Sequence, residues 1–336
     1  MTLVINFHTI EKMKIFVTGA TGFVGSHLIE YFLNRGDTEI IALVRNPDNL
    51  KWLKGLEIGV SKGDLFHIPD LPNDIDYVFH IAGLTKASQM ADYYTVNQQG
   101  TASLFRSLIS QGLKPKKVIC LSSIAVSGPS SGLVPVKEES SPAPMTHYGK
   151  SKLEGEMEAR KYGDALPVVI LRVGAVYGPR DRDFLSLFNL VKKGILPLWG
   201  RGKKWISLCY VKDLACAFEL TLEKPVFGET FHIADPEPYT WEEIGRTAGR
   251  LMGKDRIRRV YIPTAAAYPV VYLSEWIGKL TSSPSIVNSQ KLKEGLQEAW
   301  IVDVRKAKER LGYSPLYTLQ EGLRETLEWY RKTDWL

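Results

Sequence analysis

Cysteine is scarce in this sequence of 336 residues. The three cysteines are Cys120, Cys209 and Cys216, and no two of them form a C-x-x-C pair. A disulfide framework or a cysteine-based metal site is therefore not expected, and we assign no metal. We expect free thiols in a reducing cytoplasm instead, with Cys120 buried because it lies in an apolar, strand-like run.

Long apolar runs are also missing, since the chain has no stretch of about 18 consecutive apolar residues, and we expect no membrane span. Residues 1–12 precede a second methionine, Met13. They lack a basic start and a small-residue cleavage site, so we expect an extension rather than a signal peptide. Residues 265–273 are apolar and contain Pro269, and we expect them to line an apolar substrate pocket.

An excess of one charge is missing as well, because 43 Lys and Arg face 37 Asp and Glu for a formal net charge of +6. The basic residues form no stripe with interleaved aromatic residues, so nucleic acid is not an expected partner. With 44% hydrophobic and 24% charged residues, the composition is that of a globular protein. The length suits one large α/β unit and a smaller second one.

A glycine-rich turn near the N-terminus is the most informative feature. Residues 15–18 predict a buried strand, and Gly19, Gly22 and Gly25 separate it from apolar residues at helical spacing. A strand, a glycine turn and a helix start form the anion site of a dinucleotide-binding unit. We expect one glycine to allow the turn, one to admit the pyrophosphate and one to let helix and strand pack. The G-x-x-G-x-x-G spacing is by itself a weak signal.

The second predicted strand, residues 39–45, ends in a charge that bears on the choice of dinucleotide. An acidic residue at this tip would bind the ribose hydroxyls, but the residue here is Arg45, followed by Lys51 and Lys54. A guanidinium suits a 2′-phosphate, so the sequence favours NADP, with NAD as the alternative. If Arg45 has no phosphate role, it is an ordinary solvated arginine of the loop. Asp64, after the third strand, is placed to accept from an adenine amino group.

The fourth predicted strand, residues 76–83, ends in the small residues Ala82 and Gly83. Small residues there leave room for a flat ligand, because ligands bind at the carboxyl ends of parallel strands. His80 lies within the apolar strand and is expected to be packed rather than catalytic. Asn97 lies early in a predicted helix, where an asparagine is unfavourable unless it bonds something, so a structural or proton-relay role is plausible.

A serine, a tyrosine and a lysine supply a second strong signal. Ser123 ends a fifth predicted strand, residues 117–123, and Tyr148 and Lys152 are four apart at the start of a helix, on one face. A free tyrosine is a poor acid–base group at neutral pH, with a pKa near ~10. We expect the Lys152 ammonium and a cationic nicotinamide to lower that pKa, while Ser123 orients the substrate oxygen. The alternative is a surface tyrosine and lysine on an ordinary helix.

The remainder of the chain alternates between completing the sheet and building a second lobe. Further strands are predicted at residues 168–173, 205–210 and 230–234. Helices are predicted from residue 211 and at residues 240–252, 274–280, 303–311 and 319–331.

These motifs resemble those of the extended short-chain dehydrogenase/reductases, the NAD-dependent epimerase/dehydratase family. The resemblance covers nearly everything from residue 13 to the end. The matching motifs lie in the family's order at residues 18–25, 63–65, 80–83, 122–123, 148–152, 177–180, 210–214, 311–315 and 329–330.

The resemblance implies an α/β fold, a Rossmann-type doubly wound parallel sheet with a smaller C-terminal substrate-binding lobe. It implies Ser123, Tyr148 and Lys152 as catalytic residues with Asn97 in support, Lys152 on the nicotinamide ribose, and a homodimer. The expected organisation is an extension at residues 1–12, a dinucleotide-binding unit at 13–173 completed by 203–236, and a substrate lobe at 174–202 and 237–336. The expected cofactor-binding residues are Gly19, Thr21, Gly22, Phe23, Val24, Gly25, Arg45, Asp64, Leu65, Ala82, Gly83, Thr85, Tyr148, Lys152 and Val173.

Departures from the family pattern bear on the reaction. Nucleotide-sugar dehydratases resemble this fold but have Thr-Asp-Glu where this chain has Ser123 followed by Ile and Ala, without carboxylates for eliminating water. Ala175 and Ile206 stand where sugar-nucleotide epimerases have an asparagine and an arginine, and an Arg-x-Gly-Asp motif is absent from residues 285–303. Arg180, Arg201 and Lys203 are possible substitutes for those groups.

What remains is similar to the branch of 3β-hydroxysteroid dehydrogenases and dihydroflavonol reductases, in the stretch 44–51 and in the apolar residues around Val173 and Tyr268. The sequence therefore predicts an NADP-dependent oxidoreductase that interconverts an alcohol and a ketone or aldehyde on a small, largely apolar molecule. The alternatives are an NAD-dependent nucleotide-sugar 4-epimerase and a non-catalytic dinucleotide-binding subunit.

Overall fold

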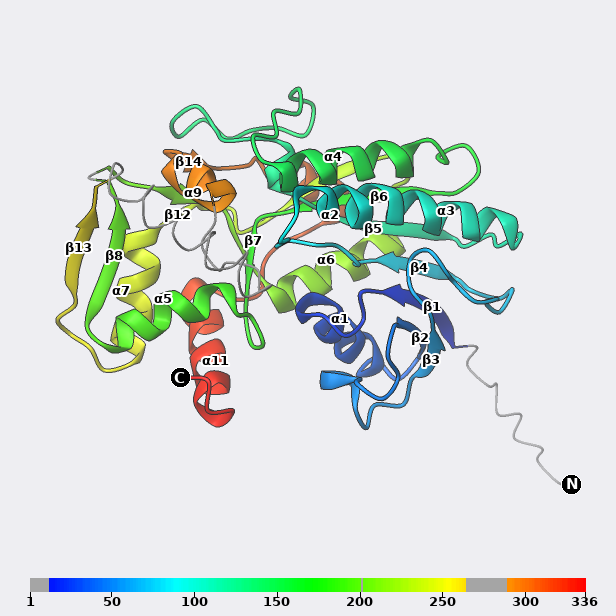
Figure 1. The fold of residues 1–336 in the computed structure, drawn as a ribbon, viewed down its shortest axis with the longest axis horizontal. Coiled ribbons are helices and arrows are strands. Elements are labelled where there is room, and N and C mark those ends of the chain that lie inside the picture. Colours follow the sequence, from blue (N-terminus) through cyan, green and yellow to red (C-terminus); the bar gives the residue numbers. More distant parts are fainter. Residues whose placement is uncertain (1–11, 201, 264–288) are drawn as a thin grey trace, which may run out of the picture.

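A parallel sheet of seven strands forms the centre of the computed structural model, which describes residues 12–200, 202–263 and 289–336 (Figure 1). The strand order is β3-β2-β1-β4-β5-β6-β11, with every neighbouring pair parallel. The order reverses between β1 and β4, the switch point at which such sheets bind ligands. The strands are β1 (Met13–Thr18), β2 (Thr38–Val44), β3 (Gly59–Lys62), β4 (Tyr77–His80), β5 (Lys117–Ser123), β6 (Val168–Val173) and β11 (Thr230–Ile233).

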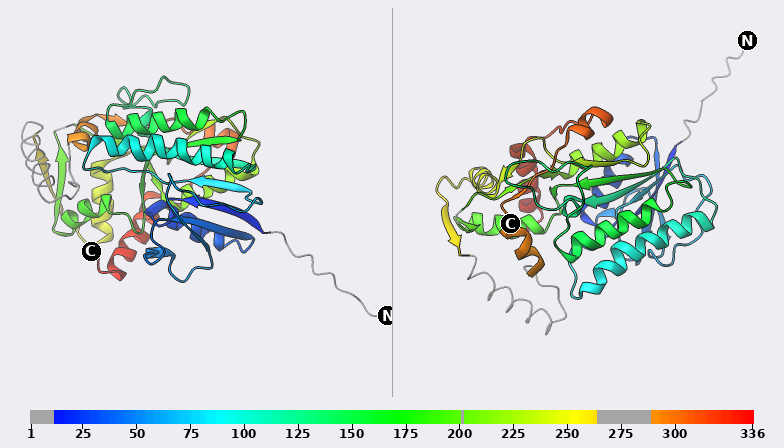
Figure 2. Two further views of the ribbon diagram at one scale, coloured as in Figure 1. Left: turned by 45° about the vertical axis from the view of Figure 1, so that its right-hand side comes forward. Right: turned by 90° about the horizontal axis from the view of Figure 1, so that it is seen from above.

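Helices cover both faces of this sheet. Because successive side chains of a strand point to opposite faces, Ile15 and Val17 pack in one core cluster and Phe16 in the other. The first cluster includes residues of α1 (Phe23–Leu33), α6 (Val211–Glu223) and α10 (Arg305–Leu311). The second includes residues of α3 (Gly100–Ser110) and α4 (His147–Arg160), which lie side by side in Figure 2. The short α2 (Met90–Tyr94) and the π-helical η2 (Thr95–Gln99) lead into α3.

A third core cluster lies away from the sheet, at the left of Figure 1. It includes residues of α5 (Asp183–Lys192), α7 (Trp241–Leu251) and α11 (Leu319–Lys332), beside the strand pair β8 (Ile195–Trp199) and β13 (Arg258–Ile262). Capping boxes start α7 at Thr240 and α11 at Thr318, where each threonine and a glutamate three residues later bond the helix start. The smaller elements are β7 (Ala175–Tyr177), β9 (Trp205–Ile206), β10 (Leu208–Tyr210), β12 (Tyr239–Thr240), α9 (Ser289–Leu296) and β14 (Ala299–Trp300).

The predicted fold class is confirmed, because the sheet is parallel, doubly wound and accompanied by a smaller C-terminal region. The predicted strand at residues 205–210 is divided in the structure. Residues 205–210 are two separate strands, β9 and β10, which pair with β12, β14 and β7 in small sheets, not with the central sheet. Elements α5, β7, β8 and β13 were not predicted from the sequence.

Several sequence-based expectations lie outside the described residues. These are most of the N-terminal extension (residues 1–11), Arg201, the apolar segment 265–273 and the predicted helix 274–280. The proposed division of the chain into two lobes stays a prediction. No helix among the residues that the structure describes is long and apolar enough to cross a membrane. Cys120, Cys209 and Cys216 are free, and Cys120 is buried as predicted.

Candidate active site

The glycine-rich turn joins the end of β1 to the start of α1, beside the end of β4. Gly19 has φ +74°, and a Cβ there would lie 2.6 Å from the backbone nitrogen of Ala82. A Cβ on Gly25 would lie 2.3 Å from the carbonyl oxygen of Gly19. Both positions therefore require glycine, the first for the left-handed turn and the second for the packing of α1 on the turn.

Gly22 has a different place, because it is the N-cap residue of α1 and is exposed. No acidic residue lies in the first turn of α1, so no side-chain charge competes for the free N–H groups there. The helix N-terminus carries a partial positive charge, and its free N–H groups are the usual ligands of a phosphate. Among the neighbouring predicted residues, Thr21, Phe23 and Val24 are half-buried, and Phe23 packs edge-on against His27 at 5.7 Å.

Arg45 directly follows β2 and is exposed, without a hydrogen bond or ion pair to the residues that the structure describes. Lys51 and Lys54, which follow it, are exposed too. The positive charges at the tip of β2 are therefore available to a ligand.

One carboxylate oxygen of Asp64 accepts hydrogen bonds within its own turn. Its Oδ1 accepts from the backbone nitrogens of Phe66 at 2.8 Å and of His67 at 2.9 Å. Burial raises the pKa of Asp64, but these amides outweigh burial and hold the pKa below its usual value. Its neighbour Leu65 is buried, so its side chain belongs to the core around α3.

The remaining predicted cofactor residues lie at the carboxyl ends of two strands. Ala82 and Gly83 follow β4, and Thr85, two residues later, is exposed. Val173 is the last residue of β6 and is buried. These places fit a ligand that lies across the carboxyl edge of the sheet.

Ser123 and Tyr148 meet although they are distant in sequence. Ser123 is the last residue of β5, and its side chain lies near the Tyr148 hydroxyl, whose pKa it lowers. Tyr148 lies in the first turn of α4, whose N-cap residue Thr146 accepts from the Gly149 nitrogen at 3.1 Å. A Cβ on Gly149 would lie 2.5 Å from the Ala125 carbonyl oxygen, so glycine allows α4 to approach the end of β5.

Lys152 follows Tyr148 by one turn of α4. Its Nζ donates to the carbonyl oxygen of Leu121 at 2.7 Å, and it lies 3.7 Å from where a Cβ of Gly83 would be. The ammonium therefore sits between β5 and the end of β4, beside the switch point of the sheet.

The protonation of these residues depends on their burial. Burial raises the pKa of Tyr148 to about 12, and the nearby Ser123 side chain offsets only part of that rise. Burial lowers the pKa of Lys152. In the protein chain alone, desolvation of the phenolate dominates the pKa of Tyr148. The lowering of this pKa was predicted with a cationic nicotinamide beside Lys152, and it stays a prediction. Tyr148 is a protonated phenol at neutral pH.

Asn97 is buried in the π-helical segment η2, and its side-chain amide is fully engaged. Its Oδ1 accepts from the Leu84 nitrogen at 2.7 Å, and its Nδ2 donates to the Leu84 carbonyl at 3.0 Å and to Ser151 Oγ at 2.9 Å. Asn97 thus ties the loop after β4 to the helix that carries Tyr148 and Lys152. These contacts favour a positioning role over the alternative of a proton relay.

His80 is packed, as predicted. Its ring nitrogens lie 2.9 Å from Thr18 Oγ1 and 2.9 Å from Thr101 Oγ1. Burial lowers the pKa of His80 to about 3, so the ring is neutral.

The sequence reasoning missed a buried ion pair next to Lys152. Glu156, one turn further along α4, accepts from Arg172 Nε at 2.9 Å and from Arg172 Nη2 at 2.8 Å. Ser122 Oγ also donates to Glu156. An arginine inside the apolar run of β6 was the available signal, because a charge there needs a buried partner.

Two of the three groups considered as substitutes for the missing phosphate ligands lie among the described residues and have other partners. Arg180 donates to Ser26 Oγ at 3.0 Å and to Glu30 Oε1 at 2.6 Å. Lys203 lies over the ring of Trp205, 5.7 Å from its centroid. Arg180 is therefore bound to α1 and is not free to bind a diphosphate.

A dinucleotide-binding α/β protein of the short-chain dehydrogenase type has its glycine-rich turn at the switch point of a parallel sheet, as this chain does. Residues 15–234 match the model of the NAD dependent epimerase/dehydratase family. That span is more than half of the chain, and the protein therefore belongs to this family. It is an enzyme family of extended short-chain type that uses NAD or NADP, so the predicted resemblance is confirmed at this level.

Relatives of known name differ in their reactions. The ceramide reductase of Caulobacter vibrioides is 28% identical over 326 residues, which are 95% of this chain and 95% of that protein. The UDP-glucose 4-epimerase of Vibrio cholerae is 30% identical over 327 residues, 94% of each chain. A solved structure of UDP-glucuronic acid 4-epimerase from Bacillus cereus, with UDP-glucuronic acid and NAD, has a TM-score of 0.77 at 26% identity, covering 96% of this chain and 100% of that one.

Proposed function

We propose that this protein is an NADP-dependent oxidoreductase that interconverts an alcohol and a ketone or aldehyde on a small, largely apolar substrate. The observation that carries this proposal is the placement of the Ser123 side chain near the Tyr148 hydroxyl at the carboxyl edge of the sheet, with Lys152 one helical turn away. These three side chains supply an oxygen-binding hydroxyl, a proton donor and a fixed positive charge.

The residues present fit a dinucleotide. The turn at Gly19, Gly22 and Gly25 leaves its backbone unshielded by side chains at the N-terminus of α1, which is where a pyrophosphate binds. When bound there, the nicotinamide supplies or accepts a hydride at the substrate's carbonyl carbon. Lys152, whose ammonium lies between β5 and Gly83, is positioned to hold the nicotinamide ribose.

The protein's own part in the reaction is proton transfer and orientation. In the reductive direction, the Tyr148 hydroxyl gives its proton to the substrate oxygen as the carbonyl carbon gains the hydride, and an alcohol results. The Ser123 hydroxyl donates to the same oxygen and holds it in line with Tyr148. The raised pKa of Tyr148, about 12, keeps the proton on the phenol until the substrate oxygen becomes basic enough to take it.

NADP is the proposed dinucleotide because of Arg45. An exposed guanidinium without a protein partner, at the tip of β2, is suited to a 2′-phosphate on the adenosine ribose. The NAD in the Bacillus cereus epimerase structure keeps NAD as the alternative.

An apolar substrate is proposed because the chain offers few groups for a diphosphate. Arg180 is bound to Ser26 and Glu30, and Ala175 and Ile206 replace polar groups of sugar-nucleotide epimerases. A 28% identical relative is a ceramide reductase, whose named substrate is a lipid. The loops at residues 85–92, 127–136 and 174–184 are the proposed lining of the substrate pocket.

The second candidate function is an NAD-dependent nucleotide-sugar 4-epimerase, which the 30% identity to the Vibrio cholerae enzyme favours. The two functions separate in one experiment. The purified protein is given NADPH or NADH with a panel of apolar ketones and aldehydes, and separately UDP-glucose without added cofactor. Ketone-dependent oxidation of NADPH supports the oxidoreductase. Conversion of UDP-glucose to its 4-epimer without net oxidation of cofactor would overturn it.

A homodimer is part of the proposal, through the outer faces of α3 and α4. Ile109 in α3 is 41% exposed and Met157 in α4 is 55% exposed, so both helices present apolar side chains to solvent. Sedimentation equilibrium gives the mass in solution, and a monomer at micromolar concentration would contradict the dimer.

A further inference from the structure

A strained turn lies between β7 and α5, at residues 179–182. Arg180 in this turn has φ +72°, a left-handed conformation that is uncommon for a residue with a side chain. Its side chain is only 11% exposed. Strained residues persist where the surrounding structure holds them firmly, and they gather at functional sites. The contacts of Arg180 therefore indicate what the turn holds in place.

The first set of contacts is with α1, the helix whose N-terminus faces the proposed pyrophosphate site. Arg180 Nη1 donates to Ser26 Oγ at 3.0 Å, and Arg180 Nη2 donates to Glu30 Oε1 at 2.6 Å. His27 Nε2 donates to the carbonyl oxygen of Pro179 at 2.8 Å. Burial lowers the pKa of His27 to about 4, so this histidine is a neutral donor at physiological pH. Three residues of α1, Ser26, His27 and Glu30, thus fix the helix to the turn.

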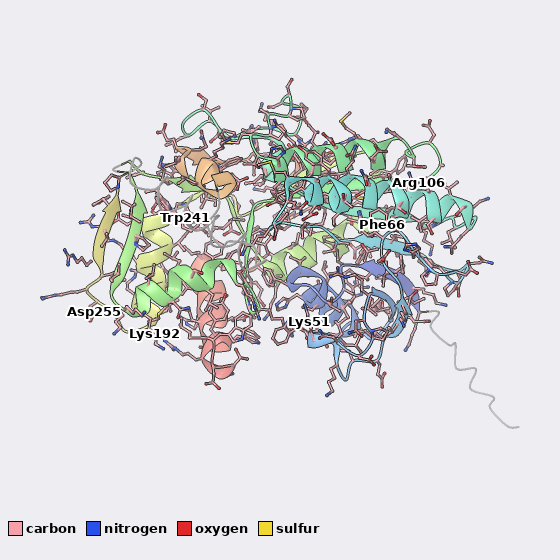
Figure 3. The ribbon with its side chains drawn as sticks, in the orientation of Figure 1. Lys51, Phe66, Arg106, Lys192, Trp241 and Asp255 are labelled. Atoms are coloured by element: carbon pink, nitrogen blue, oxygen red, sulfur yellow. The ribbon has the colours of Figure 1, made fainter. Side chains whose placement is uncertain are left out.

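The second contact is with the segment that bears Arg45. The Arg180 guanidinium lies over the ring of Trp52, 5.1 Å from its centroid. Trp52 is in η1 (Lys51–Leu53), between β2 and β3, seven residues after Arg45. Figure 3 labels its neighbour Lys51 on the side of this segment that faces α11. The Arg180 guanidinium therefore touches both α1 and the segment after β2. We expect α1 to bind the pyrophosphate and the segment after β2 to bind the adenosine ribose.

The third set of contacts reaches the end of the chain. The Trp52 ring packs edge-on against Trp329 of α11 at 5.5 Å and against Trp335 at 6.3 Å. Arg182, in the same turn as Arg180, lies over the Trp335 ring at 4.9 Å. We call these five residues the aromatic clip: Trp52, Arg180, Arg182, Trp329 and Trp335. Trp335, the penultimate residue of the sequence, thus packs on the loop next to the adenosine end of the proposed cofactor site.

We propose that the aromatic clip positions the dinucleotide. It holds the Arg45 segment at a set distance from the N-terminus of α1, and through Trp335 it makes cofactor affinity depend on the last residues of the chain. This inference rests on the proposed function, because it needs a dinucleotide at the glycine-rich turn. It applies to both NADP and NAD, because the adenosine ribose expected at the tip of β2 is common to the two cofactors.

The test compares Trp52→Ala, Trp335→Ala and the double variant by direct binding of NADPH and NADH to the purified full-length protein. The expected result is a roughly 3- to 30-fold higher Kd for each single variant, the factor that corresponds to the strength of a partly buried cation–π contact. The same loss is expected for the fragment adenosine 2′,5′-bisphosphate but not for reduced nicotinamide mononucleotide. The double variant should lose less than the sum of the two single losses, because each single variant already removes the contact between the Trp52 and Trp335 rings.

Two further variants separate positioning from general loss of structure. Trp335→Phe keeps an aromatic ring under Arg182 and should restore most of the affinity, and Arg182→Gln should weaken binding without removing a ring. Trp205→Ala removes a matched lysine–tryptophan contact in another part of the chain and should leave the dinucleotide Kd unchanged. Steady-state kinetics should show a raised KM for the cofactor and less than about a twofold change in kcat.

The outcomes are distinct. Dinucleotide binding by folded Trp335→Ala protein at the wild-type Kd would overturn the clip and leave the proposed function standing. Strictly additive losses, or equal losses for both cofactor fragments, would also overturn it. A wild-type protein that binds neither NADPH nor NADH would overturn the proposed function and the clip together.

Discussion

The carboxylate of Glu156 and the guanidinium of Arg172 form a buried ion pair through two hydrogen bonds, at 2.9 and 2.8 Å. Their side chains are 3% and 5% exposed. The pair joins α4, which carries Tyr148 and Lys152, to β6 in the central sheet. It therefore holds the catalytic helix of the proposed mechanism at a set place on the sheet.

Glu156→Gln should destabilise the fold strongly. The variant leaves the Arg172 charge buried without its partner, which typically costs about 3–5 kcal/mol. The matched control is Glu158→Gln, two residues on, because Glu158 pairs at 2.8 Å with Lys161, which is 62% exposed. The control should lose no more than about 1 kcal/mol. Urea denaturation of both variants measures the difference, and similar midpoints for the two would contradict the buried-pair argument.

Tyr148→Phe should reduce turnover by roughly 10²-fold or more, because the proposed proton donor is removed while the ring remains. The control is Tyr162→Phe, just after the other end of α4, where the Tyr162 ring stacks on Phe105 at 5.4 Å. Steady-state kinetics on the substrate found in the activity screen gives both values. Near wild-type kcat in Tyr148→Phe would remove Tyr148 from the mechanism.

Asp235→Asn should change how stability depends on pH. Burial raises the pKa of Asp235 from 3.8 to about 7, with the Asp213 charge adding to the rise. The folded state thus keeps the proton that the unfolded state loses, so this group's contribution to stability falls as the pH rises from about 4 to about 7. Asn cannot ionise, and the variant should gain a few kcal/mol relative to wild type between pH 4 and pH 8.

The control for this pH dependence is Asp74, whose contribution to stability changes with pH in the opposite direction. The Lys14 ammonium holds the pKa of the exposed Asp74 below its usual value, so Asp74 stabilises the fold above pH 3.8 and loses that effect in acid. Asp74→Asn should therefore lose stability relative to wild type at neutral pH. Denaturation midpoints at several pH values measure both variants, and parallel curves for wild type and Asp235→Asn would contradict the assigned pKa shift.

Arg45→Ala should lower the preference for NADP over NAD. Loss of a guanidinium opposite a phosphate removes a charge-assisted hydrogen bond, worth about 1.5–3 kcal/mol, so the ratio of the two affinities should fall by roughly 10-fold or more. Binding of NADPH and NADH to the same preparations measures the ratio. An unaltered ratio would show that Arg45 is a solvated loop residue.

Some elements are readable from the sequence because their signals are local. The limits of β5 and β6 agree with the predicted residues 117–123 and 168–173, since a buried parallel strand is a short apolar run. The left-handed backbone at Gly19 is also predictable from the sequence, because only glycine enters that region without strain. The predicted strand at residues 205–210 exists as β9 and β10, but its local pattern does not say which sheets the two strands join.

The sequence alone determined the fold class, the glycine-rich turn and the spacing of Tyr148 and Lys152, because apolar periodicity, glycine conformation and helical repeat are properties of neighbouring residues. The tertiary structure decided what these residues experience. In the folded protein Ser123 lies near Tyr148, and burial raises the pKa of the Tyr148 phenol to about 12. Arg180 contacts α1 and Trp52 and is not available to a substrate. Burial and long-range partners depend on how distant segments pack, and only the assembled fold contains that information.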